Sequence, residues 1–385
     1  MYITVVFLKE TKSHERRVAV TPSVAAQLIE VLGAKVQMQS GAAESIDLVD
    51  SAYHQVEAFT DRIALVRKAD VVLAVHAPAL EVIDAMQEGA ILISFIDLAA
   101  DPALLRHLQA RKITSFSMEH IPSIPRAAPM HALACQAALH GYRAVLLGAM
   151  QLARCLPELT TAAGVIGPAR VLVLGLGLAG LEATASATRM GAVVDGYDPC
   201  PDARSRAKAQ GVSVIADAVE SETSSDQPAD AHPEEWTRVD DVITWHLHQA
   251  DLIIITESIS SHVPKNITRL QVAGMKVGAV VIDLIRDGQG KCELSRPGEQ
   301  VRIGPVTILA PLDLVSQAAA DASELYARNL YHLLATMMRD QLIALDWNDE
   351  ILVQSVVTHA GVAKNCGASS PPETAAIDAD FVCPV

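Results

Sequence analysis

The chain of 385 residues is poor in aromatic side chains and in basic charge. Phe, Trp and Tyr make up only 4% of it while half of its residues are hydrophobic, so its core must be built from aliphatic side chains. Lysine and arginine together number 30 against 45 acidic residues, which gives a formal charge of −15. A charge of this sign repels phosphate backbones and anionic lipid surfaces, and it therefore argues against nucleic acid or a membrane surface as a direct partner.

Long apolar runs and paired cysteines are missing as well. No stretch reaches about 18 consecutive apolar residues, the length that a membrane-spanning helix requires. The N-terminal sequence MYITVVFLKETKSHERR passes from apolar to charged, which is the reverse of a secretory signal peptide. The six cysteines include no CxxC pair, so the sequence predicts a reducing, cytoplasmic location and neither a disulfide framework nor a metal site.

Short apolar runs alternate with amphipathic segments in two successive series. The first series predicts buried strands at Ile3–Leu8, Ala69–Val75, Ala90–Phe95 and Ile113–Phe116. The second predicts them at Arg170–Leu174, Ala192–Tyr197, Val212–Ile215, Asp251–Thr256 and Ala279–Leu284. Alternation of strands and helices over this many units favours parallel sheets with helices on both faces. We therefore predict an α/β fold with two doubly wound, Rossmann-like domains around a cleft.

Two helical runs set the predicted domain boundaries. Met130–Leu156 reads as a long connecting helix, and Val315–Ala344 has apolar residues at three- and four-residue spacing. We expect the second helix to return to the first domain, which would make that domain discontinuous in sequence. The predicted segments are an N-terminal domain of residues 1–135 completed by 311–365, a second domain of 136–310, an exposed acidic loop at Asp217–Asp241 and a disordered tail at 366–385.

The clearest chemical motif is the sequence RVLVLGLGLAGLEATA, which begins at Arg170. A strand ending at Leu174 leads into a G-x-G-x-x-G arrangement and a predicted helix at Leu181–Met190. In such a turn the first glycine permits the tight bend, the second lets backbone amides approach a pyrophosphate, and the third lets the helix pack on the strand. The sequence thus predicts a phosphate-binding turn formed by Gly175, Gly177, Leu178, Ala179 and Gly180.

An acidic residue follows at the distance expected for a dinucleotide site. Asp198 ends the next predicted strand, 18 residues beyond Gly180, and Pro199 follows it. A carboxylate there accepts hydrogen bonds from the adenosine ribose and repels a 2′-phosphate, so the pattern predicts NAD(H) rather than NADP(H). A glycine-rich turn that binds nothing and a solvated acid at a strand end remain the alternatives.

Further segments carry a resemblance that covers nearly the whole chain. They are KETKSHERRVAVTP, IPRAAPMHALACQAALHGYRAV, VVIDLIRDGQGKCELSRPGE, AADASELYARNLYHLL and LDWNDEILVQSVVTHAG. With them the chain resembles the alanine dehydrogenase/nicotinamide nucleotide transhydrogenase family, closest to the NAD(H)-binding domain I, or alpha subunit, of proton-translocating NAD(P) transhydrogenases. The resemblance implies a homodimer that passes hydride between NADH and NADP(H) on a partner subunit. It also implies a membrane subunit that moves protons, so that the chain would lie at the inner face of the membrane.

The resemblance also implies that a loop before the central helix holds the nicotinamide ring. Arg126 matches the family there. The family's arginine, glutamine, aspartate and serine are replaced by Ser123, Ala128, His131 and Ala134. Arg126 and His131 are the candidate catalytic residues, with an exposed arginine and a solvated histidine as the alternatives. The replacements keep open a catalytically reduced NAD-binding module.

A third hypothesis is an enzyme like alanine dehydrogenase that acts on another small amino or 2-oxo acid. By position Arg17 and Asp287 match the substrate-binding arginine and the aspartate near the nicotinamide in those relatives. His76 stands where they have a lysine and Asp97 where they have a histidine. His76 and Asp97 end neighbouring predicted strands, where doubly wound domains place ligands, so a catalytic pair and two polar strand-end residues without chemistry are both open.

Overall fold

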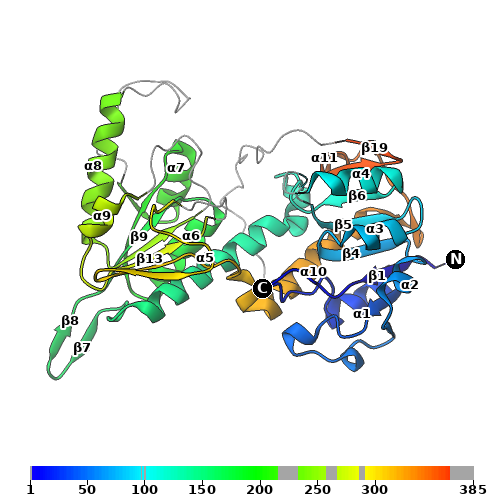
Figure 1. Ribbon diagram of the computed structural model, residues 1–385, viewed down its shortest axis with the longest axis horizontal. Helices are drawn as coiled ribbons and strands as arrows, with labels where there is room; N and C mark the ends of the chain where they lie inside the picture. Colours follow the sequence, from blue (N-terminus) through cyan, green and yellow to red (C-terminus); the bar gives the residue numbers. More distant parts are fainter. Residues whose placement is uncertain are drawn as a thin grey trace. The chain divides into compact units, whose positions relative to one another are not determined.

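The computed structural model describes residues 2–96, 98, 101–215, 233–256, 267–285 and 291–364. Within the chain there are two compact units (Figure 1). Unit 1 consists of Met1–Gln136 and Ser316–Val385, and unit 2 of Ala137–Val315. The helix α5, Ala132–Gln151, begins in unit 1 and continues into unit 2.

Unit 1 contains an eight-stranded sheet whose strands run in the order β19-β18-β6-β5-β4-β1-β2-β3. The strands from β3 to β6 pair in parallel, and β18 and β19 add an antiparallel edge. Their bounds are Thr4–Phe7 (β1), Lys35–Gln39 (β2), Glu57–Phe59 (β3), Val71–His76 (β4), Ile91–Phe95 (β5), Thr114–Ser117 (β6), Val356–His359 (β18) and Val362–Ala363 (β19). The chain leaves β1 toward β2 and returns on the opposite side with β4, so the strand order reverses between β1 and β4.

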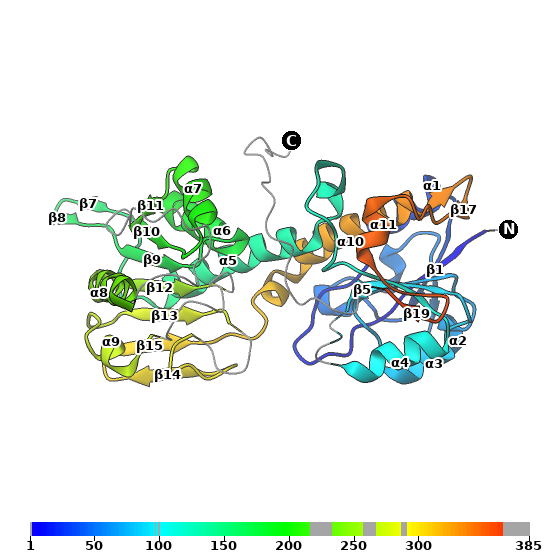
Figure 2. The same cartoon turned by 90° about the horizontal axis from the view of Figure 1, so that it is seen from above.

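Helices cover both faces of this sheet (Figure 2). Because successive strand residues point to opposite faces, Val5 and Phe7 belong to one core cluster while Val6 and Leu8 belong to the other. The first cluster includes side chains of α1 (Pro22–Glu30), α10 (Ala319–Thr336) and α11 (Glu350–Ser355). The second includes side chains of α2 (Arg62–Val66), α3 (Leu80–Ala85) and α4 (Pro102–Ala110).

Unit 2 repeats the same plan with a seven-stranded sheet in the order β11-β10-β9-β12-β13-β15-β14. All neighbours pair in parallel except β14 and β15. The bounds are Arg170–Leu174 (β9), Val193–Tyr197 (β10), Ser213–Val214 (β11), Leu252–Ile255 (β12), Val280–Asp283 (β13), Gln300–Ile303 (β14) and Val306–Leu309 (β15). Here the order reverses between β9 and β12, and such a reversal opens a crevice at the carboxyl ends of the strands.

The helices of unit 2 also divide between the two faces of its sheet. Side chains of α5, α6 (Leu178–Arg189) and α7 (Pro201–Ala209) pack in one core cluster. Side chains of α8 (Pro233–Gln249) and α9 (Arg269–Ala273) pack in the other. A hairpin of β7 (Leu159–Thr161) and β8 (Gly164–Ile166) has every residue exposed.

The predicted α/β class and the predicted strands of both series are confirmed. The helix predicted at Val315–Ala344 is wrong at its C-terminal end, because α10 stops at Thr336. Asp340 and Gln341 both take positive φ angles, which form a tight turn between β16 (Met338–Arg339) and β17 (Leu342–Ile343). The predicted acidic loop is also partly wrong, since α8 begins at Pro233 inside it. The predicted tail at 366–385 lies outside the described residues.

Candidate functional site

The glycine-rich turn joins β9 to α6 at the point where the strand order of unit 2 reverses. Gly175 has a φ of 97°, a left-handed conformation that favours glycine. Gly177 is the N-cap of α6 and has ordinary extended angles, φ −72° and ψ −166°. The helix therefore begins at Leu178, earlier than the sequence suggested, and the amides of its first turn have no acceptor within the helix. Such a helix end attracts anions.

Close backbone packing holds the turn in place. A Cβ atom on Gly180 would lie 1.8 Å from the carbonyl oxygen of Gly175, so only glycine fits where α6 meets the turn. A Cβ atom on Gly141 of α5 would lie 2.0 Å from the carbonyl oxygen of Ala179, so α5 crosses α6 equally closely. The buried Thr256 hydroxyl donates to the carbonyl oxygen of Gly175 at 3.1 Å. The sequence reasoning identified Gly180 but missed Gly141 and Thr256, which come from other segments of the chain.

Asp198, which directly follows the neighbouring strand β10, forms a hydrogen bond with the backbone of the turn. Its carboxylate is 1% exposed and accepts the backbone N–H of Leu176 at 2.7 Å and that of Cys200 at 2.8 Å. Burial raises the pKa of this carboxyl, and the two N–H donors oppose that shift. Each oxygen keeps a second lone pair, but at 1% exposure the carboxylate is covered, so a ribose diol would reach it only if the residues around it move.

An arginine that the sequence reasoning did not single out lies close to Asp198. Arg204 of α7 donates from Nη1 to the carbonyl oxygens of Asp198, at 3.0 Å, and Pro199, at 2.8 Å. No arginine follows Asp198 directly in sequence, but α7 turns this one back to the end of β10. The contacts with two carbonyl oxygens fix the turn that begins at Asp198.

Arg126 lies in unit 1, in the 3₁₀ helix Pro125–Met130. Its guanidinium bonds both oxygens of Asp349, at 2.5 and 2.9 Å, and Asp349 is the N-cap of α11. The Arg126 side chain remains 57% exposed. Arg126 thus pairs with a carboxylate that lies 223 residues away in the sequence, a contact that no local sequence pattern predicts.

Ser123, Ala128 and Ala134 form one hydrogen-bonded turn around His131. The His131 backbone N–H donates to the Ala128 carbonyl oxygen at 3.2 Å. Its Nδ1 accepts the Ala134 backbone N–H at 3.3 Å, and its Nε2 lies 3.4 Å from the Ser123 hydroxyl. Burial lowers the pKa of His131, which favours the neutral ring that can accept at Nδ1. The His131 ring and backbone thus link three other residues of this loop by hydrogen bonds.

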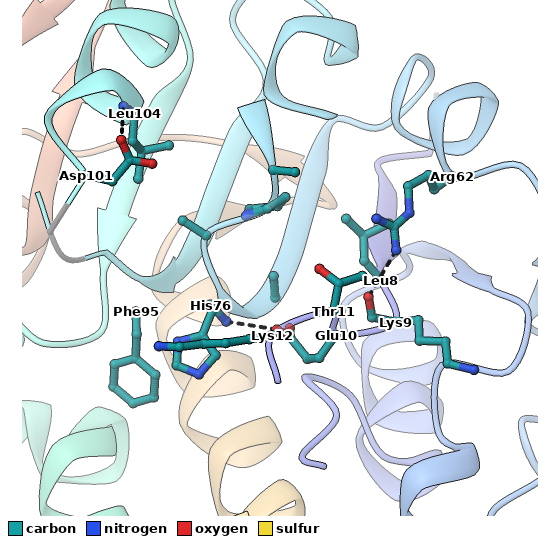
Figure 3. Close-up of a pocket in the computed structure, with 14 residues that line it drawn as sticks. Leu8, Lys9, Glu10, Thr11, Lys12, Arg62, His76, Phe95, Asp101 and Leu104 are labelled. Atoms are coloured by element: carbon teal, nitrogen blue, oxygen red, sulfur yellow. Dashed lines mark hydrogen bonds between the residues drawn. The ribbon is translucent and has the colours of Figure 1, made fainter. Parts of the chain in front are cut away.

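Two of the residues considered for a small substrate, Arg17 and His76, contact a buried carboxylate in unit 1. His76 also lines a pocket of about 340 Å³ in this unit (Figure 3). Glu15 contacts the Arg17 guanidinium at 2.6 Å and His76 Nε2 at 2.8 Å. Arg17 also donates to the Gln136 side chain at 2.9 Å. Burial acts to raise the pKa of Glu15, but hydrogen bonds from Arg17 and His76 outweigh it and hold the pKa well below its usual range. Asp97 and Asp287 lie outside the described residues.

Two family models match the chain, and the second extends beyond unit 2 into the C-terminal residues of unit 1. Models of the alanine dehydrogenase/PNT N-terminal and C-terminal domains match residues 6–140 and 144–365. The chain belongs to the alanine dehydrogenase/PNT family. The resemblance noted in the sequence is thereby confirmed.

Within the alanine dehydrogenase/PNT family the chain is more similar to transhydrogenases. It is 34% identical over 367 residues to an NAD(P) transhydrogenase alpha-subunit chain of Rhodospirillum rubrum, covering 92% of this chain and 95% of that protein. The crystal structure of a transhydrogenase from Sinorhizobium meliloti matches with a TM-score of 0.82 and 32% identity, covering 93% and 99% of the two chains. An alanine dehydrogenase of Halomonas elongata is more distant, with 29% identity over 306 residues and about three quarters of each chain.

Proposed function

We propose that the chain is the NAD(H)-binding alpha subunit of a proton-translocating NAD(P) transhydrogenase, which passes hydride between NADH and NADP(H) held on a partner subunit. The observation that carries the proposal is the turn from Gly175 to Gly180, bound to Asp198 through Leu176. The similarity to transhydrogenase alpha subunits over almost the full chain supports it. We also propose a homodimer and an NADP-binding and a membrane subunit as partners, because the family resemblance implies them. Within the described residues no helix has the length and apolar character needed to cross a membrane.

The residues present fit a dinucleotide. The free amides at the start of α6 would face its pyrophosphate, and Asp198 would accept from its adenosine ribose. When bound, NADH supplies the hydride from its nicotinamide ring. The protein's role is to hold and orient the dinucleotide, since correct positioning alone removes much of a barrier between two bound reactants.

Substitution of Gly177 by valine tests this site. Because Gly177 has ordinary backbone angles, valine requires no left-handed strain and adds bulk where the pyrophosphate would lie. We expect NADH affinity in a calorimetric titration to fall at least tenfold, or about 1.4 kcal/mol. Gly167→Val is the matched control, because its Cβ would meet nothing within 4 Å. Undiminished NADH affinity in Gly177→Val would refute the assignment.

A catalytically reduced NAD-binding module is the second candidate. The hydrogen-bonded turn around His131 favours it, because Ser123, Ala128 and Ala134 bond with His131. The two candidates differ in one measurement. A purified NADP-binding transhydrogenase subunit is added to the NADH-loaded chain, and reduction of an NADP analogue is followed by absorbance. Reduction supports the transhydrogenase, whereas tight NADH binding without reduction supports the reduced module.

A further inference from the structure

We propose that the coenzyme site of unit 2 also accepts NADP(H), with the Arg204 guanidinium binding the 2′-phosphate of its adenosine ribose. The inference rests on the proposed function, because it concerns the same dinucleotide site. It goes beyond that function in coenzyme specificity, since an acidic residue at the end of the second strand ordinarily selects NAD(H). What matters for this selection is which charged group at the strand end a ligand can reach.

The Asp198 carboxylate is covered by the protein. Asp198 follows β10 directly, at the position where an acid excludes a 2′-phosphate by charge repulsion. It is only 1% exposed, and its two oxygens accept the backbone N–H groups of Leu176 and Cys200, one each. A carboxylate held in this way presents little surface to a ligand. Asp198 therefore acts chiefly on the conformation of the glycine-rich turn.

Arg204 of α7 reaches the same strand end and has free hydrogen-bond donors. Its Nη1 donates to the carbonyl oxygens of Asp198, at 3.0 Å, and Pro199, at 2.8 Å. Its Nε and Nη2 have no acceptor among the residues that the structure describes, and neither is a buried atom without a partner. Both donors of this half-buried side chain are therefore open to solvent. A ligand at the end of β10 can reach them.

The two free donors of Arg204 have the geometry that a phosphate requires. In the planar guanidinium group the Nε–H and one Nη2–H point in the same direction. Such a pair donates two parallel hydrogen bonds to two oxygens of one phosphate group. The carbonyl oxygens of Asp198 and Pro199 hold Nη1, so the guanidinium plane is already oriented before a ligand binds.

The charge at this strand end is locally positive, although the whole chain carries a formal charge of −15. Burial raises the pKa of Asp198, while its two N–H donors and the charges of Arg204 and Arg206 oppose that shift. Two guanidinium groups thus act on one carboxylate. The helix α7 also carries Lys208 and a single acid, Asp202, which is exposed and therefore screened by water and salt. This balance of charges favours an added phosphate.

The test compares NADH with NADPH, because the two coenzymes differ only in the 2′-phosphate. Each is titrated into the full chain by calorimetry at constant ionic strength. We expect NADPH to bind with a Kd within tenfold of that of NADH. Arg204→Gln should weaken NADPH binding at least tenfold more than NADH binding, since NADH lacks the group that the guanidinium binds.

Arg269→Gln is the matched control. It removes the same charge from an exposed position of unit 2, on α9, whose side chains pack in the core cluster on the other face of the sheet from α7. The ratio of the two affinities should stay unchanged in this variant.

Three results would overturn the inference. The first is NADPH binding more than tenfold weaker than NADH binding in the unmodified chain. The second is an equal loss of both coenzymes in Arg204→Gln, which would mean that Arg204 only supports the turn. The third is an equal change of the affinity ratio in Arg269→Gln, which would mean that the 2′-phosphate responds to overall charge. NADH binding without NADPH binding refutes this inference alone, whereas the absence of NADH binding refutes the proposed function.

Discussion

Replacement of Gly141 by alanine sets helix propensity against packing. In the interior of a helix, alanine is favoured over glycine by about 1 kcal/mol. Here the new Cβ would lie 2.0 Å from the carbonyl oxygen of Ala179, so the two backbones must separate by 1.0 Å to reach even 3.0 Å. Overpacking of this kind costs about 1–3 kcal/mol. Here the atoms nearest to the new Cβ belong to the backbone, so no side chain can rotate away to relieve the clash. We expect a net loss of stability of about 1 kcal/mol, after the gain in propensity, and weaker NADH binding because Ala179 belongs to the glycine-rich turn.

Thermal unfolding and NADH titration measure the two effects. A loss of about 1 kcal/mol would lower the melting temperature by about 2–4 °C. Gly148→Ala, in the same helix, is the control, because its Cβ would meet the flexible Leu252 side chain, 2.5 and 2.7 Å from the two methyl groups and 3.2 Å from Cγ, rather than the backbone of the turn. It should change stability while leaving NADH affinity intact. A Gly141→Ala protein that is more stable than the unmodified chain and binds NADH equally well would contradict the close approach of the α5 and α6 backbones.

Two further predictions concern buried polar groups. Thr256→Val keeps the shape of the side chain but leaves the Gly175 carbonyl oxygen without its hydroxyl donor, so denaturant titration should show a loss of about 1–3 kcal/mol, whereas Thr256→Ser should retain most of the stability. Burial raises the pKa of Glu10 from 4.5 to about 7, so the folded chain binds this proton more tightly than the unfolded chain. The resulting contribution to the free energy of unfolding is complete below pH 4.5. It falls by about 3 kcal/mol as the pH rises through 7. Glu15, whose pKa is lowered, contributes a constant amount above about pH 4.5 and loses it only at lower pH. The difference in stability between the unmodified chain and Glu10→Gln should therefore slope from pH 5 to 7, and a flat difference would contradict the burial of Glu10.

The sequence predicted the central strands because continuous apolar runs are unambiguous in sheets that are covered on both faces. It did not predict β2, whose sequence KVQMQ alternates polar and apolar residues, or β3, whose three residues are all exposed. Strands near a sheet edge lack the continuous signal. The antiparallel pair β14 and β15 was missed as well.

The candidate site likewise contains residues that the sequence predicts and contacts that it does not. Gly175, Gly177 and Gly180 could be predicted because the turn needs them at fixed spacing within one segment. The contacts of Arg126 with Asp349 and of Thr256 with Gly175 could not, because they join residues 223 and 81 positions apart. Such pairs follow from the tertiary fold, and no local pattern encodes them.

The closed turn around His131 makes its residues energetically dependent on one another. The imidazole accepts the Ala134 backbone N–H and lies 3.4 Å from the Ser123 hydroxyl, so a change of either His131 or Ser123 alone removes a contact of the other. Substitutions at these two positions should therefore be non-additive, with the double variant losing less stability than the two single variants together.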